Sequence, residues 1–377
     1  MTRNKVQALT LPLPISIPST DPDVLFQEFE QLLVSNSGED AFDVAIKLLA
    51  AKLHDELCMR EGNQPKRFIV HPSSQVTNAS IEKLLRGAAR RWAGIIEFNG
   101  GLNLTPEQLL RCMHPLCGWS LLEGSFVHLD AVLERLVARG SKGSLGQYFT
   151  PRSVIKMCVQ ILNPKPNEKL IDPASGSGGF LFEAIRYSEQ LYGHSPQCLG
   201  IDFGTRALKV SSLLATAIGN DRIQFSRANS IDGREFSHQE PPPEWNPFLG
   251  KIDTTSLNQK AKYHPWGAWH NLRCDVLLTN PPFAGELSDP EIIEAYESQR
   301  LDSSRKKCVI GREHLFLDRA ISLLKPGGRL AIVLPQGILA NASAAYLRRW
   351  AMHNCRVLGV VGLHPYTFLP HTGVKTS

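Results

Sequence analysis

Hydrophobic positions in the first third of the chain recur at helical spacing. Between residues 21 and 140, apolar side chains return every three or four positions, as they do at Phe42, Ala45, Leu49 and Leu53. The run TPEQ at residues 105–108 adds a helix start, with an N-cap residue, a proline at the first helical position and a glutamine three residues after the cap. The pattern predicts a helical N-terminal domain over residues 21–140, preceded by a flexible arm at residues 1–20.

The pattern changes after the Gly/Ser-rich linker RGSKGSLG at residues 139–146. Short apolar runs typical of buried strands then alternate with helical patterns at residues 179–189, 205–218 and 313–324. The expected strands lie in the runs KLIDP, CLGIDF, RIQFSRA, CDVLLTN, RLAIVLP and RVLGVVGL. This alternation predicts an α/β fold over residues 141–377, a doubly wound and mostly parallel sheet with helices on both faces.

Composition narrows the class of protein only slightly. The 377 residues are 42% hydrophobic and 20% charged, with a net charge of +5, which permits contact with nucleic acid without requiring it. No apolar run approaches the roughly 18 residues of a membrane span, and the N-terminus lacks the continuous apolar core of a signal peptide. The eight cysteines have no paired spacing. We therefore expect reduced thiols, no metal site and a cytoplasmic protein.

Candidate chemistry begins at the end of the first predicted strand, in IDPASGSGGFLFEA. Asp172 precedes Gly176 and Gly178, which let the backbone turn tightly at the start of a helix. Asp202 ends the second predicted strand, where an acid can accept both hydroxyls of a ribose. A purely structural turn is the alternative for the glycines alone, but the two features together indicate a nucleoside-containing cofactor.

The charge of Asp172 distinguishes between cofactors. A carboxylate directly before the turn repels a pyrophosphate and attracts an ammonium group, and this loop lacks the Lys-Ser/Thr ending of a phosphate-binding loop. A cofactor with an amino-acid head, a ribose and an adenine suits this position better than a dinucleotide. S-adenosylmethionine is such a molecule.

The run NPPF follows the fourth predicted strand and points to the substrate. The Asn280 side chain and the Pro281 carbonyl can accept hydrogen bonds from an exocyclic amine and aim its lone pair at an electrophilic methyl. Prolines 281 and 282 hold these acceptors rigidly, and Phe283 offers a face on which a flipped base can stack.

With these motifs in place, the chain resembles the N6-adenine DNA methyltransferases, most closely the modification subunit of type I restriction-modification systems. The runs LGQYFTPRSVIKMCVQIL, DPASGSGGFL, NPPF and HLFLDRAISLLKPGGRLAIVLPQGIL appear in the order of the γ-type arrangement. The resemblance covers about residues 120–377. The helical N-terminal region is a looser match. The resemblance implies transfer of a methyl group from S-adenosylmethionine to the N6 amine of adenine in DNA, a separate specificity subunit and a restriction subunit as partners.

The resemblance also implies roles for individual residues. Tyr148, Phe149 and Thr150 would line the cofactor, with Thr150 near its carboxylate. The methionine end would be held by Asp172, Ser175, Gly176 and Gly178, the ribose by Asp202 and the adenine by Asn229. The target amine would be bound by Asn280 and Pro281, with Pro282 stiffening the loop and Phe283 stacking on the base.

Three parts of the sequence depart from the family or stand outside its motifs. Residues 231–273 look like an insertion with Trp245, Trp266 and Trp269, which favours a packed surface loop over base stacking. After LPHTGVKTS the family continues with an antiparallel strand, so we expect that this chain is truncated or that the strand is supplied elsewhere. A basic set could be a solvated loop or a phosphate-contacting lid, and it consists of Arg300, Arg305, Lys306, Lys307 and Arg312.

Two alternatives stay open on the sequence alone. One is a methyltransferase acting on another planar amine or amide, such as an RNA base or a protein glutamine, because the same acceptor chemistry serves all of them. The other is a truncated scaffold without catalytic activity that binds a partner or DNA.

Overall fold

The computed structural model describes residues 41–62, 64–98, 101–118, 120–122, 150–234, 242–250, 271–300, 309–369 and 373–377. The chain forms two compact units, one from Met1–Ala88 and Phe98–Val132 and the other from Ala89–Glu97 and Leu133–Ser377. The domain boundary predicted near residue 140 lies outside the described residues, so it stays a prediction.

The first unit is built from helices. It contains α2 (Ala41–Gly62), most of α3 (Ser74–Arg91) and α4 (Pro106–Cys117). The periodic positions Phe42, Ala45, Leu49 and Leu53 are all buried, as the pattern predicts. Helix α4 begins with the predicted capping box, in which Thr105 accepts from the Gln108 N–H and the Gln108 side chain accepts from the Thr105 N–H. The helical patterns at residues 21–33 and 128–138 lie outside the described residues.

A parallel sheet forms the centre of the second unit. Its strands run in the order β3-β2-β1-β4-β7 and every neighbouring pair is parallel, which confirms the predicted doubly wound class. Their bounds are β1 (Lys169–Asp172), β2 (Gln197–Asp202), β3 (Ile223–Arg227), β4 (Cys274–Thr279) and β7 (Leu324–Ile332).

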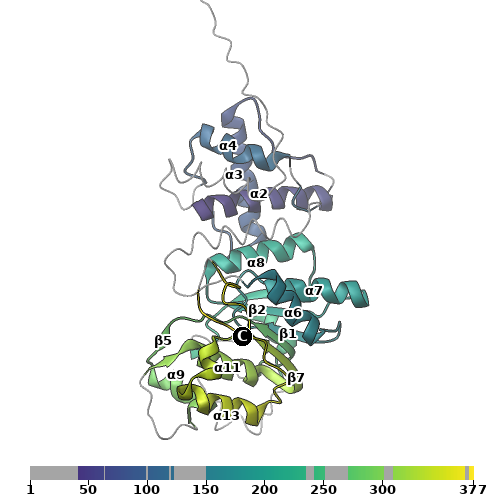
Figure 1. The fold of residues 1–377 in the computed structure, drawn as a ribbon. Helices are drawn as coiled ribbons and strands as arrows, with labels where there is room; N and C mark the ends of the chain where they lie inside the picture. Colours follow the sequence, from purple (N-terminus) through teal and green to yellow (C-terminus); the bar gives the residue numbers. More distant parts are fainter. Residues whose placement is uncertain are drawn as a thin grey trace, which may run out of the picture. The chain divides into compact units, whose positions relative to one another are not determined.

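Helices lie on both sides of this sheet (Figure 1). One group contains α6 (Arg152–Leu162), α7 (Gly179–Tyr192) and α8 (Thr205–Ile218), and the other contains α9 (Pro290–Ala295), α11 (Arg312–Leu323) and α13 (Ala345–Asn354). Shorter elements connect them: η2 (Pro243–Phe248), β5 (Glu286–Leu287), α10 (Glu297–Arg300), β6 (Ile310–Gly311), α12 (Gln336–Ala340) and η5 (Ala342–Ala344). Among the helices that the structure describes, none is both long and apolar enough to cross a membrane.

The sixth predicted strand, RVLGVVGL, is a correction. Residues 356–364 have no regular secondary structure, and the side chains of Val357, Leu358, Val360 and Val361 are 47–79% exposed. A strand requires a backbone partner along its length. Within the described part of the chain, this segment has one such contact, the Leu363 N–H donating to the Thr376 carbonyl at 3.0 Å.

Thr376 itself lies between two segments. It forms an antiparallel bridge with Pro335, and Leu334 and Ser377 exchange two backbone hydrogen bonds of 2.9 Å. The last described residues therefore pair antiparallel with the segment that follows β7, beside residue 363.

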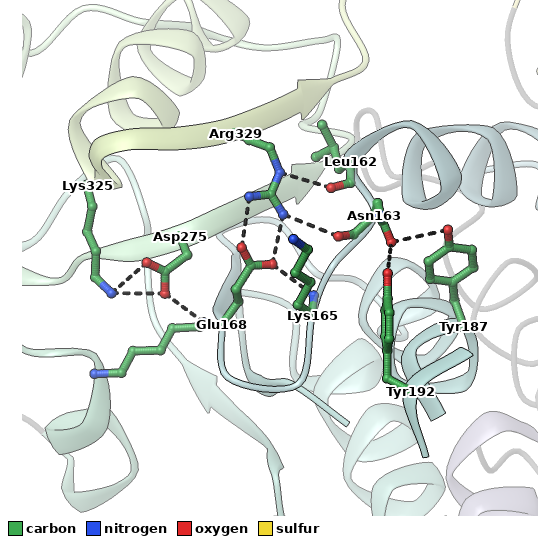
Figure 2. A network of polar contacts seen from close by, with 10 residues as sticks. Leu162, Asn163, Lys165, Glu168, Tyr187, Tyr192, Asp275, Lys325 and Arg329 are labelled. Atoms are coloured by element: carbon green, nitrogen blue, oxygen red, sulfur yellow. Dashed lines mark hydrogen bonds and ion pairs between the residues drawn. The ribbon is translucent and has the colours of Figure 1, made fainter. Parts of the chain in front are cut away.

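A polar network closes the amino-terminal edge of the sheet, opposite the ends where the strands point (Figure 2). The guanidinium of Arg329 on β7 donates to both carboxylate oxygens of Glu168 at 2.8 Å and to the Leu162 carbonyl at 2.9 Å. Lys325 binds both oxygens of Asp275, which also accepts from the Lys169 N–H. These contacts join the end of α6 and the starts of β1, β4 and β7.

Candidate active site

The predicted site residues gather at the carboxyl ends of three neighbouring strands. Asp172 is the last residue of β1, Asp202 is the last residue of β2, and Asn280 follows directly after β4. Since β1 lies between β2 and β4, this is the point at which the chain crosses from one half of the sheet to the other. Ligands of doubly wound sheets bind at such a point.

The glycine turn after β1 is determined by backbone conformation and by close packing. Gly178 has φ +93°, and a Cβ there would lie 2.7 Å from the rings of Phe182 and Phe225. Gly176 has φ +54°, and among the described residues it faces open space, with no atom within 4 Å of the place of a Cβ. The turn therefore leaves room above Gly176 while packing tightly at Gly178.

Asp202 is bound to the turn by its carboxylate. One oxygen accepts from the Gly176 N–H at 2.8 Å and the other from the Gly204 N–H at 2.7 Å. Burial raises the pKa of Asp202, and these backbone N–H groups oppose the shift. Each carboxylate oxygen has a second lone pair, so Asp202 can both hold the turn and accept hydrogen bonds from a ligand.

Asp172 is the most perturbed acid of the site. It is 1% exposed, and burial raises its pKa to about 7, opposed by the side chain of Thr279 and by the Ala174 N–H. The nearby charge of Asp202 adds to the increase. A buried carboxyl with such a pKa is stabilised in its charged form when a cation binds beside it.

Two further predicted residues lie in loops that follow strands, Ser175 after β1 and Asn229 after β3. The Ser175 hydroxyl is buried and has no hydrogen-bond partner within the described residues. The Asn229 side chain accepts from the Ile231 N–H at 3.2 Å, so it turns the loop after β3. Tyr148 and Phe149, which we predict to line the cofactor, lie outside the described residues.

Thr150 and Asn280 are in direct contact, although 130 positions separate them in sequence. The Asn280 Nδ2 donates to the Thr150 Oγ1 at 2.9 Å. The other end of the amide, Oδ1, is buried and accepts no hydrogen bond in the part of the chain described. A buried carbonyl without a donor is costly, and it marks the place where a donor from a substrate fits.

The aromatic residue of the NPPF run has a neighbour that sequence reasoning missed. The ring of Phe283 lies edge-on to the ring of Phe368, with 5.8 Å between centroids, and Phe368 is 2% exposed. Pro281 is buried and Pro282 is half-buried.

Phe203, directly after Asp202, is a second aromatic residue near the site that the sequence analysis did not name. It is 62% exposed, and the Arg227 guanidinium lies 5.7 Å from its ring. The run GIDF carried a signal for Phe203, whereas no local pattern marks Phe368.

The loop after NPPF is fastened to the start of α11. Strands β5 and β6 pair antiparallel, and the Arg312 N–H donates to the Gly285 carbonyl at 3.1 Å. Gly285 has φ +104°, and a Cβ there would lie 3.0 Å from the Arg312 Nε. The Arg312 side chain thus lies against the loop that carries Asn280. The other basic residues singled out, at positions 305–307, are outside the described residues, and the side chain of Arg300 is too.

The insertion contributes to the core in its described part. Trp245 and Phe248 of η2 are at most 1% exposed, and Leu249 bridges to Leu272. For Trp245 this agrees with a packing role, whereas Trp266 and Trp269 lie outside the described residues.

Burial raises the pKa of the Cys112 thiol to about 11, typical of a neutral thiol. No group of three His, Cys, Asp or Glu side chains within the described ranges could hold a metal ion.

Comparison with known proteins gives curated relatives that include methylase subunits of type I restriction enzymes and type II methyltransferases. The chain is 29% identical over 243 residues to the methylase subunit of the type I restriction enzyme StySPI from Salmonella potsdam, which covers 64% of this chain and 41% of that subunit. It spans about two fifths of the length of the first curated relatives that it matches.

Solved structures show the same fold. The methyltransferase subunit of a type I restriction-modification system from Streptococcus thermophilus matches with a TM-score of 0.61 at 17% identity, covering 94% of this chain and 84% of that one. A chain from a structure on the complex assembly of the type I restriction-modification system matches with a TM-score of 0.62 at 18% identity, covering 95% of this chain and 73% of that one. The family model for N-6 DNA methylase matches residues 130–377. This chain therefore belongs to the N-6 DNA methylase family.

Proposed function

We propose that this chain is an adenine-specific DNA methyltransferase, which transfers a methyl group from S-adenosylmethionine to the N6 amine of adenine as the modification subunit of a type I restriction-modification system in the cytoplasm. The observation that carries the proposal is the buried Oδ1 of Asn280, which has no hydrogen-bond partner among the described residues and lies at the end of β4, beside the two acids that end β1 and β2. Membership of the family and the names of the relatives support the reaction class.

The residues present fit S-adenosylmethionine. Asp172 suits the ammonium of the amino-acid head, because a cation compensates for the burial of its charge. Asp202 keeps free lone pairs for two ribose hydroxyls, and the open space over Gly176 admits the cofactor close to the backbone. When bound, the cofactor would supply an electrophilic methyl group on a sulfonium, whose sulfur keeps the bonding electrons and becomes a neutral thioether when the methyl group is transferred.

The chain's own residues act on the acceptor amine. Asn280 Oδ1 and the Pro281 carbonyl accept hydrogen bonds from the N6 amine, which aims the nitrogen lone pair and stabilises positive charge as it develops there. Phe283, half-buried against Phe368, offers an aromatic surface for a base that has left the stack. A base held this way is a flipped adenine rather than one paired in a duplex.

Partners belong to the same proposal. The relative in type I systems is named a methylase subunit, which implies other subunits in its enzyme. We propose a separate specificity subunit that selects the DNA sequence, and a restriction subunit in the complete complex.

The test is radiolabelled methyl transfer to DNA, with and without a candidate specificity subunit, followed by nucleoside analysis. We expect label in N6-methyladenine. Label in RNA, in protein glutamine or in no product, while the protein binds S-adenosylmethionine in calorimetry, would refute the proposed substrate.

Asn280→Ala tests the catalytic assignment in the same assay. The variant loses an acceptor that matters mainly in the transition state, so the rate should fall by about 10²–10³. Cofactor affinity should hold, because the contacts at Asp172 and Asp202 are unchanged. An unreduced rate in a variant that binds cofactor normally would remove Asn280 from the mechanism.

A further inference from the structure

The contact between Thr150 and Asn280 raises a question of orientation. An amide side chain has nearly the same shape when its oxygen and nitrogen are exchanged, so its neighbours must decide which end faces the substrate. The orientation matters here, because Oδ1 accepts from an amine while Nδ2 cannot. The Thr150 hydroxyl, 2.9 Å from Nδ2, is the one hydrogen-bond partner of the Asn280 side chain within the described residues.

A hydroxyl alone does not fix that orientation. Thr150 Oγ1 accepts from Nδ2 in the structure, but the same hydroxyl could donate its proton to Oδ1 if the amide were turned over. The deciding factor is therefore where the Thr150 proton goes. The hydroxyl has no acceptor for this proton in the part of the chain described, and its only hydrogen bond there is the one from Asn280.

A carboxylate beside Thr150 would accept a hydrogen bond from its hydroxyl. Thr150 stands directly before α6, whose N-cap residue Pro151 has no side chain that can cap the free N–H groups of the first turn. Those N–H groups favour an anion at this place. On the proposed function, the amino-acid head of the cofactor carries its carboxylate on the same carbon as the ammonium that Asp172 receives.

We propose that Thr150 couples cofactor binding to the orientation of the catalytic amide. Once the Thr150 hydroxyl donates to the cofactor carboxylate, its oxygen can only accept, which holds Nδ2 toward Thr150 and Oδ1 toward the substrate amine. The relay is a chain of hydrogen bonds, in which no proton is transferred: Thr150 donates to the carboxylate, Asn280 donates to Thr150, and the adenine amine donates to Asn280. Thr150 is thus a positioning residue for Asn280. The inference rests on the proposed function.

The first test separates positioning from simple cofactor binding. Thr150→Val keeps the shape of the side chain and removes the hydroxyl. If Thr150 only binds the cofactor, saturating S-adenosylmethionine restores the single-turnover rate. If it positions Asn280, the rate at saturation stays about tenfold or more below wild type, because one hydrogen bond of about 1.4 kcal/mol corresponds to tenfold. Thr150→Ser, which keeps the hydroxyl, should recover most of the rate.

A double-mutant cycle tests whether the effect passes through Asn280. In an Asn280→Ala background, Thr150→Val should reduce the saturated rate by less than twofold, because no amide is left to orient. A full tenfold further loss in that background would overturn the proposal, and so would an unreduced saturated rate in the single variant.

A readout without DNA tests the same coupling. The side-chain amide signal of Asn280 in ¹⁵N-labelled protein can be assigned by its absence in Asn280→Ala. S-adenosylhomocysteine, which keeps the carboxylate, should shift this signal and slow the exchange of its amide protons, whereas the decarboxylated analogue should not. No shift with S-adenosylhomocysteine, under conditions where calorimetry shows saturation, would refute the relay. Wild-type protein that shows the shift but methylates no adenine would refute the proposed function instead.

Discussion

At the scale of a single residue, the buried carboxyl of Asp172 lowers the stability of the protein without cofactor, although its charge suits a bound cation. Its carboxyl is 1% exposed and its pKa is raised to about 7, so the folded protein binds a proton there that the unfolded chain releases near its ordinary value of 3.8. Between these values the folded state binds more protons than the unfolded state. The free energy of unfolding contributed by this group therefore decreases as the pH rises from about 4 to 7.

Asp172→Asn should consequently stabilise the protein without cofactor. The gain should be small near pH 4, grow toward pH 7 and then level off, at on the order of 2–4 kcal/mol. Denaturant unfolding of both proteins at several pH values measures it. The same variant should bind S-adenosylmethionine at least tenfold more weakly, because the amide offers no charge to the ammonium. A constant stability difference across this range would show that Asp172 does not titrate as described.

The placement of the candidate site residues was predictable from sequence where each one ends or directly follows a strand. That Asp172, Asp202 and Asn280 lie at one edge could be predicted, because the carboxyl ends of parallel strands meet there. The contact of Thr150 with Asn280 could not be predicted, because the two segments are remote in sequence and only the folded chain brings them together. Phe368 was missed for the same reason.

At the scale of elements, the Arg329 network fixes the edge of the sheet that is remote from the site (Figure 2). Arg329→Ala would remove the guanidinium that donates to Glu168 and to the Leu162 carbonyl and leave Glu168 only the Lys165 N–H as a donor among the described residues, so we expect a loss of about 1–3 kcal/mol of unfolding free energy. Cofactor affinity should not change, because the site lies at the opposite strand ends. Lys165→Ala, in the loop that carries Glu168, removes an exposed cation and should change stability by less than about 0.5 kcal/mol.

Chemical denaturation of the two variants checks this prediction. Equal stabilities would mean that the ion pair contributes nothing, as many exposed pairs do. Weaker cofactor binding in Arg329→Ala would show that the two edges of the sheet are coupled.

The elements themselves were predicted unequally. Five of the six expected strands formed, because each is an apolar run with a neighbour on the sheet. The sixth, RVLGVVGL, has the composition of a strand but no partner along its length in the described residues, so hydrophobicity alone did not determine its structure. The pairing of Thr376 with Pro335 could not be read from the sequence either, because the terminal residues carry no periodic pattern.

For the whole molecule, a net charge of +5 limits what the chain can do with DNA by itself. We expect weak binding without sequence preference and a shallow dependence on salt, since few phosphates can be neutralised. Fluorescence anisotropy across a salt series measures this. Tight, sequence-specific binding by the isolated chain would contradict the proposal that a separate specificity subunit selects the DNA sequence.

Arg312 offers a matched comparison in that experiment. The Arg312 N–H donates to the Gly285 carbonyl in the loop after NPPF, so on the proposed function a guanidinium here suits a phosphate next to a flipped base. Arg312→Ala should reduce the steepness of the log–log salt dependence by about one. Arg349→Ala removes the same charge from an exposed position on α13 and should leave the slope unchanged. Equal slopes for both variants would exclude a phosphate contact at Arg312.

The central place of β1 also has a consequence for how the protein is made. On one edge of β1, Leu170 pairs with Cys198 of β2, which follows soon after in sequence. On the other edge, Leu170 pairs with Val276 of β4, which is more than 100 residues away. Pairings between distant segments form late in folding. On the ribosome, Asp172 and Asp202 therefore emerge long before Asn280, and β1 has an open edge during that interval, which is a template for aggregation. On the proposed function, the half of the site suited to the cofactor is synthesised first, and the chain gains Asn280 only when synthesis reaches the second half of the sheet.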